Sequence, residues 1–252
     1  MNIDLSGKTI LVTGAGRGIG AAIARRLGQS GASVAVHYSR ARDQAEALAR
    51  EIGNGARAIG ADLSGADGCV SLWQYVEAEW GAIDGLVNNA GIAIESPLDK
   101  PVQGWLADWQ ETMRVNVEAV GLLCRLATEH FKARGGGRIV NIASRAAFRG
   151  DTPDYLAYAA SKAAVVALTR SIARGFGKYG IKAFILAPGF TRTDMATAFI
   201  ERYGEDYAMN GVELARLTEP DDIAPLATLL LSGLADHATG ATIDVNAASY
   251  VH

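Results

Sequence analysis

The sequence has few cysteines, no long hydrophobic run and no block of basic residues. Its two cysteines, Cys69 and Cys124, lie far apart and outside any metal-ligand spacing, so we predict no metal site. We expect both thiols to be reduced, as in a cytoplasmic protein. No stretch of about 18 apolar residues occurs, and residues 1–14 lack the apolar segment of a signal peptide. We therefore predict neither a membrane span nor secretion.

The charge balance also excludes a class of partner. The 24 Lys and Arg residues are slightly outnumbered by 27 Asp and Glu, which gives a formal net charge of −3. A weakly acidic chain without a basic block is not typical of proteins that bind nucleic acid non-specifically. The length allows two small domains or one large domain. Because no Pro/Ser-rich linker or repeat interrupts the sequence, we predict a single domain over residues 1–252.

Short apolar runs alternate with longer helical patterns along the whole chain. The predicted strands cover residues 9–13, 33–37, 57–59, 83–87, 138–142, 181–186 and 241–245. The predicted helices cover residues 19–29, 43–52, 67–80, 105–133 and 155–179. This alternation predicts an α/β doubly wound Rossmann fold, with a parallel seven-stranded sheet and helices on both faces. In such folds ligands bind beyond the carboxyl ends of the strands, where the strand order reverses.

The first predicted strand leads into a glycine-rich turn, Thr13-Gly-Ala-Gly-Arg-Gly-Ile-Gly20. The glycines permit a tight turn and a close approach of the backbone, and the following helix start offers free N–H groups to a pyrophosphate. The run fits T-G-x-x-x-G-x-G and does not fit G-x-G-x-x-G in any register. Its place between a buried strand and a helix favours dinucleotide binding over a plain turn, with Gly14, Gly18, Ile19 and Gly20 at the cofactor.

The end of the second predicted strand indicates which cofactor binds. An acidic residue there binds the ribose 2′-hydroxyl of NAD, whereas an arginine accommodates the 2′-phosphate of NADP. Ser39 and Arg40 follow this strand, no carboxylate occurs before Asp43, and Arg17 adds a cation inside the glycine turn. Because guanidinium groups make charge-assisted contacts with phosphate, we predict NADP(H) over NAD(H). The alternative is that Arg40 and Arg42 are solvated surface charges.

Tyr158 and Lys162 form a candidate acid/base pair. They are four residues apart in a predicted helix, so they share one face. A tyrosine has a pKa of about 10, and a nearby positive charge lowers it. The pair therefore offers a general acid/base for neutral pH. Taken alone, the same spacing is also typical of an ordinary helix with a solvated lysine.

Over almost its whole length the chain resembles the short-chain dehydrogenase/reductase family. Besides the glycine turn, further segments match the family's motifs in order: Asp62-Leu63, its adenine-contacting pair; Asn88-Asn-Ala-Gly91, its N-N-A-G motif; Asn116, Ser144, Tyr158 and Lys162, its catalytic tetrad; and Pro188-Gly-Phe-Thr-Arg-Thr193, the segment around its nicotinamide. The joint occurrence of these motifs on the expected strand ends is far more specific than any one of them.

The resemblance implies an enzyme that interconverts a carbonyl and a secondary alcohol by hydride transfer. Tyr158 would be the general acid/base, and Lys162 would lower its pKa and hold the nicotinamide ribose. Ser144 would bind the substrate oxygen, and Asn116 would hold a water that links Lys162 to solvent. The remaining cofactor contacts implied by the family are Asp62, Leu63, Asn89, Ala90, Gly91, Pro188, Gly189, Thr191 and Thr193.

The substrate is less sharply indicated. The nearest sub-family resemblance is to β-ketoacyl-acyl-carrier-protein reductases, yet relatives acting on other ketones, sugars and polyols share the motifs. We predict a general carbonyl reductase, with a mobile substrate lid over about residues 190–217 that carries Phe199, Tyr203 and Tyr207. Ser144 and Tyr158 are 14 residues apart, one more than is common in the family, which predicts a bulged loop over the substrate.

Two other functions stay open, and the family implies an assembly. An NAD-dependent sugar or polyol dehydrogenase would carry the same motifs, and a non-catalytic regulatory protein would keep the nucleotide site alone. The four tetrad residues favour an enzyme. Relatives are mostly homotetramers built on the helices at about residues 105–133 and 155–179, so we expect a homotetramer here.

Overall fold

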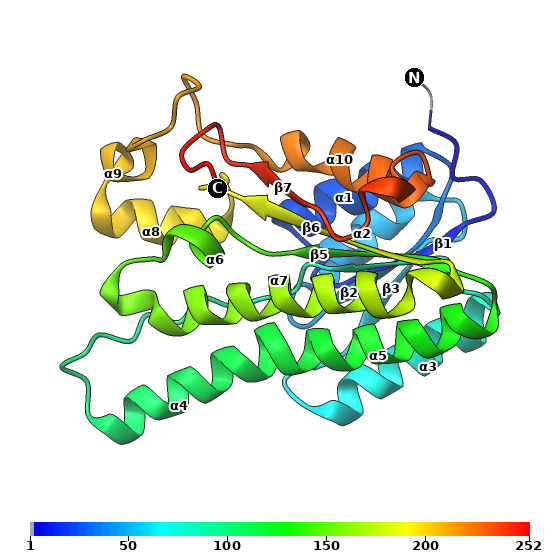
Figure 1. Ribbon diagram of the computed structural model, residues 1–252, viewed down its shortest axis with the longest axis horizontal. Helices are drawn as coiled ribbons and strands as arrows, with labels where there is room; N and C mark the ends of the chain where they lie inside the picture. The colour runs from blue at the N-terminus through cyan, green and yellow to red at the C-terminus, as the bar shows by residue number, and fades with distance from the viewer. Residues whose placement is uncertain (1–2) are drawn as a thin grey trace.

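The computed structural model describes residues 3–252, apart from the side chains of Ala198 and Tyr207, so Tyr207 of the predicted lid lies outside the described side chains. Seven parallel strands form one sheet in the order β3-β2-β1-β4-β5-β6-β7 (Figure 1). The strands are β1 (Thr9–Val12), β2 (Ser33–Tyr38), β3 (Arg57–Gly60), β4 (Gly85–Asn88), β5 (Gly137–Ile142), β6 (Ile181–Pro188) and β7 (Thr242–Val245). The predicted parallel seven-stranded sheet is confirmed.

Helices cover both faces of this sheet. The longer ones are α1 (Gly18–Gln29), α2 (Arg42–Ile52), α3 (Ala66–Trp80), α4 (Val102–Met113), α5 (Ala119–Ala133), α7 (Leu156–Phe176) and α10 (Pro220–Ser232). The short ones are α6 (Ala146–Arg149), α8 (Asp194–Tyr203) and α9 (Glu205–Met209), with 3₁₀ turns η2 (Pro153–Tyr155), η3 (Gly177–Tyr179) and η4 (Asp236–Ala238). Helices α1, α2 and α10 pack on one face, and α3, α5 and α7 pack on the other (Figure 1).

The alternation of side chains along the strands explains the two cores. Ile10 and Val12 of β1 belong to the core under α1 and α10, whereas Leu11 between them belongs to the core under α3 and α5. All three are almost fully buried. A strand that is apolar on both faces fits only a sheet covered on both sides, which is why the continuous hydrophobic runs identified the fold.

Several predicted bounds differ from the structure, and no helix was predicted over α10. The helix predicted over residues 105–133 begins at Val102 and is interrupted by a π-helical turn, η1 (Arg114–Glu118). Turns of this type occur frequently at functional sites, and this one carries Asn116. The strand predicted over residues 83–87 begins only at Gly85. Ile83 precedes the strand, and its N–H donates to Nε2 of His130 at 3.1 Å.

The strand order reverses between β1 and β4, so the carboxyl ends of these strands form the expected ligand edge. Thr13 joins the two ends. Its hydroxyl donates to the Val87 carbonyl at 3.3 Å and accepts the N–H groups of Asn89 and Ala90, each at 3.0 Å. The glycine turn and the N-N-A-G motif therefore lie side by side. No helix within residues 3–252 has the length and apolar character to cross a membrane.

Candidate active site

The glycine turn after β1 leaves a helix N-terminus open. Within the described residues, the first turn of α1 has no acidic side chain, and its N-cap residue Arg17 makes no side-chain cap. Gly14 (φ +62°) and Gly18 (φ +54°) adopt left-handed backbone conformations. A Cβ on Gly20 would lie 2.4 Å from the Gly14 oxygen and 2.5 Å from Nδ2 of Asn89. Only glycine fits here, and the uncapped N–H groups of α1 suit the pyrophosphate of a dinucleotide.

The N-N-A-G motif connects this turn to the tetrad residues. The Nδ2 atom of Asn89 donates to the carbonyl oxygens of Thr13 and Gly14 at 3.0 and 3.1 Å. At the other end of the motif, a Cβ on Gly91 would lie 3.2 Å from Oδ1 of Asn116 and 3.4 Å from Nζ of Lys162. The backbone of the motif thus passes directly between the nucleotide turn and the residues predicted to do chemistry.

The residues predicted to hold the adenosine end lie after β2 and β3. Ser39 and Arg40 are exposed at the end of β2. The Oδ1 atom of Asp62 accepts the N–H of Ser64 at 2.9 Å. Hydrogen bonds from Ser64 hold the pKa of Asp62 below its usual value, and the nearby charge of Arg40 adds to this effect. Leu63 is buried beside them.

Arg17 contacts a segment that the motif did not suggest. Its Nη1 atom pairs with Oδ2 of Asp194, the first residue of α8, at 2.8 Å. Thr193 precedes it and caps α8, because its Oγ1 accepts the N–H of Ala196 at 3.4 Å. The Thr193 methyl group would lie 3.2 Å from a Cβ placed on Gly18. The start of α8 therefore packs directly against the nucleotide turn.

The segment that ends β6 is held by its own hydrogen bonds. Thr191 donates from its hydroxyl to the Gly189 carbonyl at 3.2 Å, and Thr193 donates to the Thr191 carbonyl at 3.2 Å. A Cβ on Gly189 would lie 2.8 Å from that of Asn246. Pro188 is the last residue of β6, so this segment leaves the sheet at the ligand edge.

Asn116 is fixed on the π-helical turn by three hydrogen bonds. Its Nδ2 atom donates to the Ile92 carbonyl at 2.9 Å and to Oγ of Ser161 at 3.0 Å. Its Oδ1 atom accepts the N–H of Ile92 at 2.9 Å. The side chain thus ties the loop after β4 to α7, and it is 1% exposed.

Lys162 is buried in the same place. The residue is 6% exposed, and its Nζ atom donates to the Ile142 carbonyl at 2.9 Å. Burial disfavours an ammonium group and lowers the pKa of Lys162 to about 8. The Nζ atom lies 5.7 Å from the centre of the Tyr158 ring. The spacing in α7 therefore brings the two groups together as predicted.

The predicted lowering of the Tyr158 pKa is wrong for this structure. Burial raises the pKa of Tyr158 to about 12, the charge of Asp151 adds to the rise, and a hydrogen bond with Ser144 opposes it. The residue as a whole is only half-buried. Removal of the phenol from water thus outweighs the hydrogen bond with Ser144. A phenol that keeps its proton through neutral pH is suited to act as a general acid.

Ser144 begins the loop that leads from β5 to α7. Its Oγ atom accepts the N–H of Ala146 at 3.1 Å, at the start of α6. Gly150 (φ +79°) follows α6, and the 3₁₀ turn η2 leads into α7. The loop between Ser144 and Tyr158 is therefore occupied by two short helical turns rather than by extended chain.

Helix α8 lies against the loops around the tetrad. The Tyr203 hydroxyl donates to Oδ2 of Asp154 at 3.0 Å, in the loop before α7. Arg202 forms an ion pair with Glu95, in the loop after β4. The buried Phe199 ring packs on that of Tyr203, with centroids 4.4 Å apart. These contacts place α8 over the edge of the site.

Sequence reasoning missed His37, which also contacts the nucleotide turn. It lies in β2 and is 1% exposed, and its Nδ1 atom accepts the N–H of Gly14 at 3.0 Å. Burial lowers the pKa of His37 to about 4. The sequence could have indicated His37, because a histidine lies within a largely apolar strand, close to the predicted cofactor residues Ser39 and Arg40.

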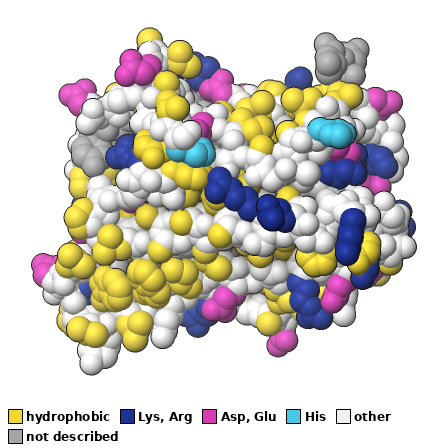
Figure 2. All heavy atoms as spheres, viewed as in Figure 1, with side chains coloured by type: hydrophobic (Ala, Val, Ile, Leu, Met, Phe, Trp, Pro, Cys, Tyr) yellow, Lys and Arg dark blue, Asp and Glu magenta, His cyan; other side chains and the backbone are white. Residues whose placement is uncertain are grey.

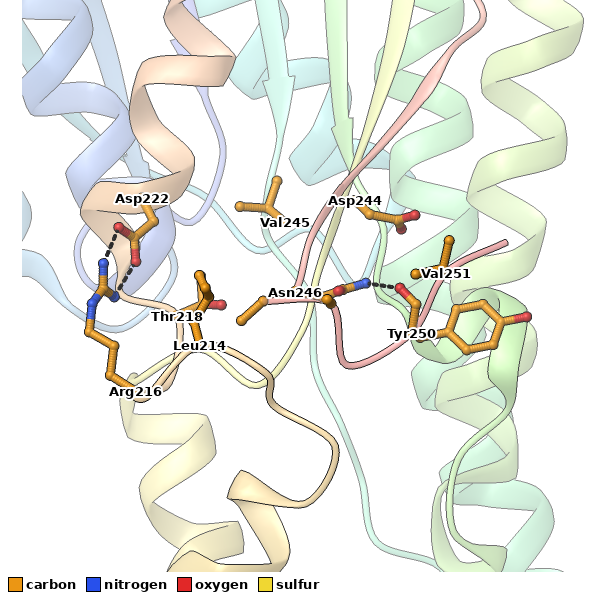
Figure 3. Close-up of a pocket in the computed structure, with 11 residues that line it drawn as sticks. Leu214, Arg216, Thr218, Asp222, Asp244, Val245, Asn246, Tyr250 and Val251 are labelled. Atoms are coloured by element: carbon orange, nitrogen blue, oxygen red, sulfur yellow. Dashed lines mark hydrogen bonds and ion pairs between the residues drawn. The ribbon is translucent and has the colours of Figure 1, made fainter.

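A separate cavity of about 420 Å³ opens between α10, β7 and the last residues of the chain (Figure 3). Arg216 lines this cavity, and its guanidinium group is paired with both carboxylate oxygens of Asp222, at 2.6 and 2.7 Å. Its lining includes Asn246, which donates to the Tyr250 carbonyl at 2.9 Å, and does not include a tetrad residue. We therefore do not assign this cavity to the reaction.

The family model for short chain dehydrogenase matches residues 8–204. The chain belongs to the short-chain dehydrogenase/reductase family. It is 35% identical over 247 residues to the 3-oxoacyl-(acyl-carrier-protein) reductase FabG of Staphylococcus aureus, covering 97% of this chain and 98% of that protein. The protein is thus an oxidoreductase that acts on alcohols and carbonyls with a nicotinamide cofactor.

Solved structures of the family are similar over nearly the whole chain. A putative NAD(P)-dependent gluconate 5-dehydrogenase from Beutenbergia cavernae, with bound NADP, has a TM-score of 0.90 and 34% identity, covering 98% of each chain. A 7 alpha-hydroxysteroid dehydrogenase complexed with NADH and a 7-oxo bile acid has a TM-score of 0.89 and 32% identity, covering 98% of this chain and 95% of that chain. The same architecture therefore serves different cofactors and different ketones.

Proposed function

We propose that the protein is an NADP(H)-dependent carbonyl reductase and alcohol dehydrogenase in which Tyr158 is the general acid/base. One observation carries the proposal: the Tyr158 phenol is hydrogen bonded to Ser144, and the buried Lys162 beside it donates to the carbonyl of Ile142, the last residue of β5. NADPH, when bound, supplies the hydride that reduces the carbonyl carbon. The residues of this chain supply the position of the carbonyl and the proton.

Ser144 and Tyr158 divide the work at the carbonyl oxygen. The Ser144 hydroxyl donates to that oxygen and orients it, and the Tyr158 phenol donates the proton that completes the alcohol. With a pKa of about 12, the phenol holds its proton at neutral pH and is ready for the reducing direction. In the oxidising direction the same oxygen must first lose that proton, so oxidation gains from alkaline conditions.

Lys162 and Asn116 support the return of the proton. Both line the backbone of Gly91, as the short distances from its Cβ position show. The Oδ1 atom of Asn116 accepts one protein N–H and keeps a second lone pair for a water. Such a water, placed between Asn116 and Lys162, would relay a proton from solvent towards Tyr158. Lys162 also provides the positive charge that a phenolate needs once the proton has left.

The end of β2 supports NADP(H) as the cofactor. Ser39 and Arg40 are exposed there, and residues 39–42 contain no carboxylate that would repel a 2′-phosphate. The similar gluconate dehydrogenase carries NADP and the similar hydroxysteroid dehydrogenase carries NADH, so the choice depends on local residues rather than on the fold. Arg17, in the glycine turn itself, offers a second guanidinium group once it leaves Asp194.

The small-molecule substrate is a ketone or the corresponding alcohol. We propose one domain over residues 1–252, in which residues 190–217, with α8 and α9, form a substrate lid. The contacts of Tyr203 with Asp154 and of Arg202 with Glu95 support this proposal, because they hold α8 against the loops around the tetrad. The two buried thiols fit a reducing compartment, which supports a cytoplasmic location.

An apolar surface supports a homotetramer. Hydrophobic side chains gather over α4 and the adjoining side of α7 (Figure 2). The exposed hydrophobic side chains of these two helices and of the segment before α4 include Leu98, Val102, Leu106 and Leu156, whose exposed fractions range from 42% to 73%. Contiguous apolar patches of this kind usually mark interaction sites. Sedimentation velocity should show a species of four chains, and Leu106→Lys should shift it towards smaller species.

The central experiment follows reduced nicotinamide absorbance with a panel of ketones. The panel contains an acetoacetyl thioester, a 5-keto sugar acid and a 7-oxo steroid, which match the chemistry of the similar proteins, each with NADPH and with NADH. We expect turnover with NADPH, and we expect Tyr158→Phe to abolish it while NADPH binding persists. Clear preference for NADH would overturn the cofactor assignment. Substantial turnover by Tyr158→Phe would remove Tyr158 from the acid/base role.

A further inference from the structure

Two successive peptide units of the nucleotide turn are each held at both ends. The first unit joins Thr13 to Gly14, and the second joins Gly14 to Ala15. Both carbonyl oxygens accept from Nδ2 of Asn89, at 3.0 and 3.1 Å. Both N–H groups point the other way, to His37. The N–H of Gly14 donates to its Nδ1 atom at 3.0 Å, and the N–H of Ala15 donates to its carbonyl oxygen at 2.7 Å.

The second ring nitrogen of His37 fixes the tautomer and reaches the adenine side of the site. Its Nε2 atom lies 3.1 Å from the Ala61 carbonyl, which can only accept a hydrogen bond. Nε2 therefore carries the proton, and Nδ1 is left as the acceptor for Gly14. Ala61 immediately precedes Asp62, one of the residues proposed to contact adenine. The low pKa of His37 agrees with a ring that stays neutral at physiological pH.

The conformation of the turn explains why it needs hydrogen bonds with both Asn89 and His37. Gly14 has a φ of +62°, and glycine loses more conformational freedom on ordering than any other residue. An unpaired N–H at this half-buried position would also favour other peptide orientations, since a donor removed from water without an acceptor costs free energy. If the turn adopts its ligand-binding conformation in only a fraction of the molecules, the apparent affinity for the ligand is reduced by that fraction.

We propose that His37 is a positioning residue for the cofactor: its δ nitrogen, opposite Asn89, holds the Thr13–Ala15 turn in the shape that receives the pyrophosphate. This inference rests on the proposed nicotinamide dinucleotide site and goes beyond the residues that its motifs name. His37 touches neither the reacting atoms nor the substrate. Its loss should therefore weaken cofactor binding and leave the maximal rate unchanged.

Two substitutions separate the two ring nitrogens. His37→Asn keeps an acceptor at the δ position and loses the ε donor. His37→Gln keeps a donor that can reach Ala61 and loses the δ acceptor. His130→Gln is the matched control, because His130 is another buried histidine with partners on both ring nitrogens, and it lies between Glu77 and Ile83 away from the turn.

The measurement is the dissociation constant of NADPH, from tryptophan fluorescence titration of the full chain, together with the thermal midpoint of each variant. We expect His37→Gln to raise the dissociation constant about tenfold, which corresponds to about 1.4 kcal/mol. His37→Asn should bind nearly as well as the wild type, and His130→Gln should lose stability without losing affinity. At saturating NADPH, the rate with a ketone turned over by the wild type should be the same in both His37 variants.

The outcomes separate this inference from the proposed function. Equal NADPH binding by the wild type, His37→Asn and His37→Gln would overturn the inference alone. Equal loss in both His37 variants, or a fall in the saturated rate without a change in affinity, would also overturn it, because neither follows from a δ acceptor acting on the turn. A wild-type protein that binds neither NADPH nor NADH would overturn the proposed function and this inference with it.

Discussion

Replacement of Lys162 by methionine should abolish turnover and stabilise the fold. Burial lowers the pKa of Lys162 from 10.5 to about 8. At 1.36 kcal/mol per pKa unit, the buried ammonium costs the folded protein about 3 kcal/mol at neutral pH. Methionine removes this cost but leaves the Ile142 carbonyl without its donor, at about 1–2 kcal/mol. A net gain of about 1–2 kcal/mol should raise the melting temperature by about 2–8 °C in a chain of this size.

The pH dependence of this difference tests its cause. The pKa of Lys162 is lower in the folded state than in the unfolded chain, so the unfolded chain binds the extra proton at intermediate pH. The cost is therefore fully present below about pH 8 and disappears as the pH rises towards about 10.5. The wild type should gain stability relative to Lys162→Met across that range. The difference in melting temperature should vanish between about pH 9 and pH 10 and reverse above it, because the loss of the bond to the Ile142 carbonyl remains.

Differential scanning fluorimetry at fixed protein concentration provides the comparison. Lys178→Met is the control, because it removes an exposed lysine just beyond the same helix. It should change the melting temperature little at neutral pH. A Lys162→Met protein that is less stable than the wild type at neutral pH, or a difference that does not change with pH, would refute the argument from burial.

Three other substitutions test the nucleotide site, each by NADPH titration. Arg40→Asp should weaken NADPH binding by about 10- to 100-fold and spare NADH, because it removes a charged partner of the 2′-phosphate; equal loss for both cofactors would place Arg40 elsewhere. Asp194→Asn should strengthen NADPH binding by at most about fivefold, since the exposed ion pair that it breaks with Arg17 is worth at most about 1 kcal/mol, and the gain should shrink in high salt. Gly20→Ala should largely remove binding, because its Cβ would lie 2.4 Å from a carbonyl oxygen of the turn, whereas Gly121→Ala, with open space around it, should bind normally.

The sheet could be predicted from the sequence because its determinants are local. Ile10, Leu11 and Val12 are apolar in succession, and only a strand covered on both faces accommodates that pattern. The pairing of Tyr158 with Lys162 could be predicted for a similar reason, since the two residues are one helical turn apart. The order of the motifs along the chain could also be read from the sequence. Because the motifs follow parallel strands, the fold brings them to one edge of the sheet.

Contacts between distant segments could not be predicted. The pair between Arg17 and Asp194 joins residues 177 positions apart, and no local pattern signals it. The π-helical turn at Asn116 depends on bonds from its side chain to Ile92 and Ser161, which come from two other segments. The extent of burial is likewise a property of the assembled fold, so the sequence alone could not show which influence on Tyr158 would dominate.

Burial of the acid/base pair has a further consequence for the reaction. At neutral pH the Tyr158 phenol holds its proton, and Lys162, with a pKa of about 8, is mostly an ammonium. The resting site therefore contains a buried cation that donates a hydrogen bond to the Ile142 carbonyl and forms no ion pair with a carboxylate within the described residues. When Tyr158 gives its proton to a carbonyl oxygen, the phenolate forms close to that cation, with Nζ 5.7 Å from the ring centre. A lone buried charge becomes part of an ion pair in surroundings where Coulomb attraction is stronger than in water. The free energy that destabilises the resting fold is thus partly recovered as the proton leaves, so the lysine that lowers stability also favours the transfer.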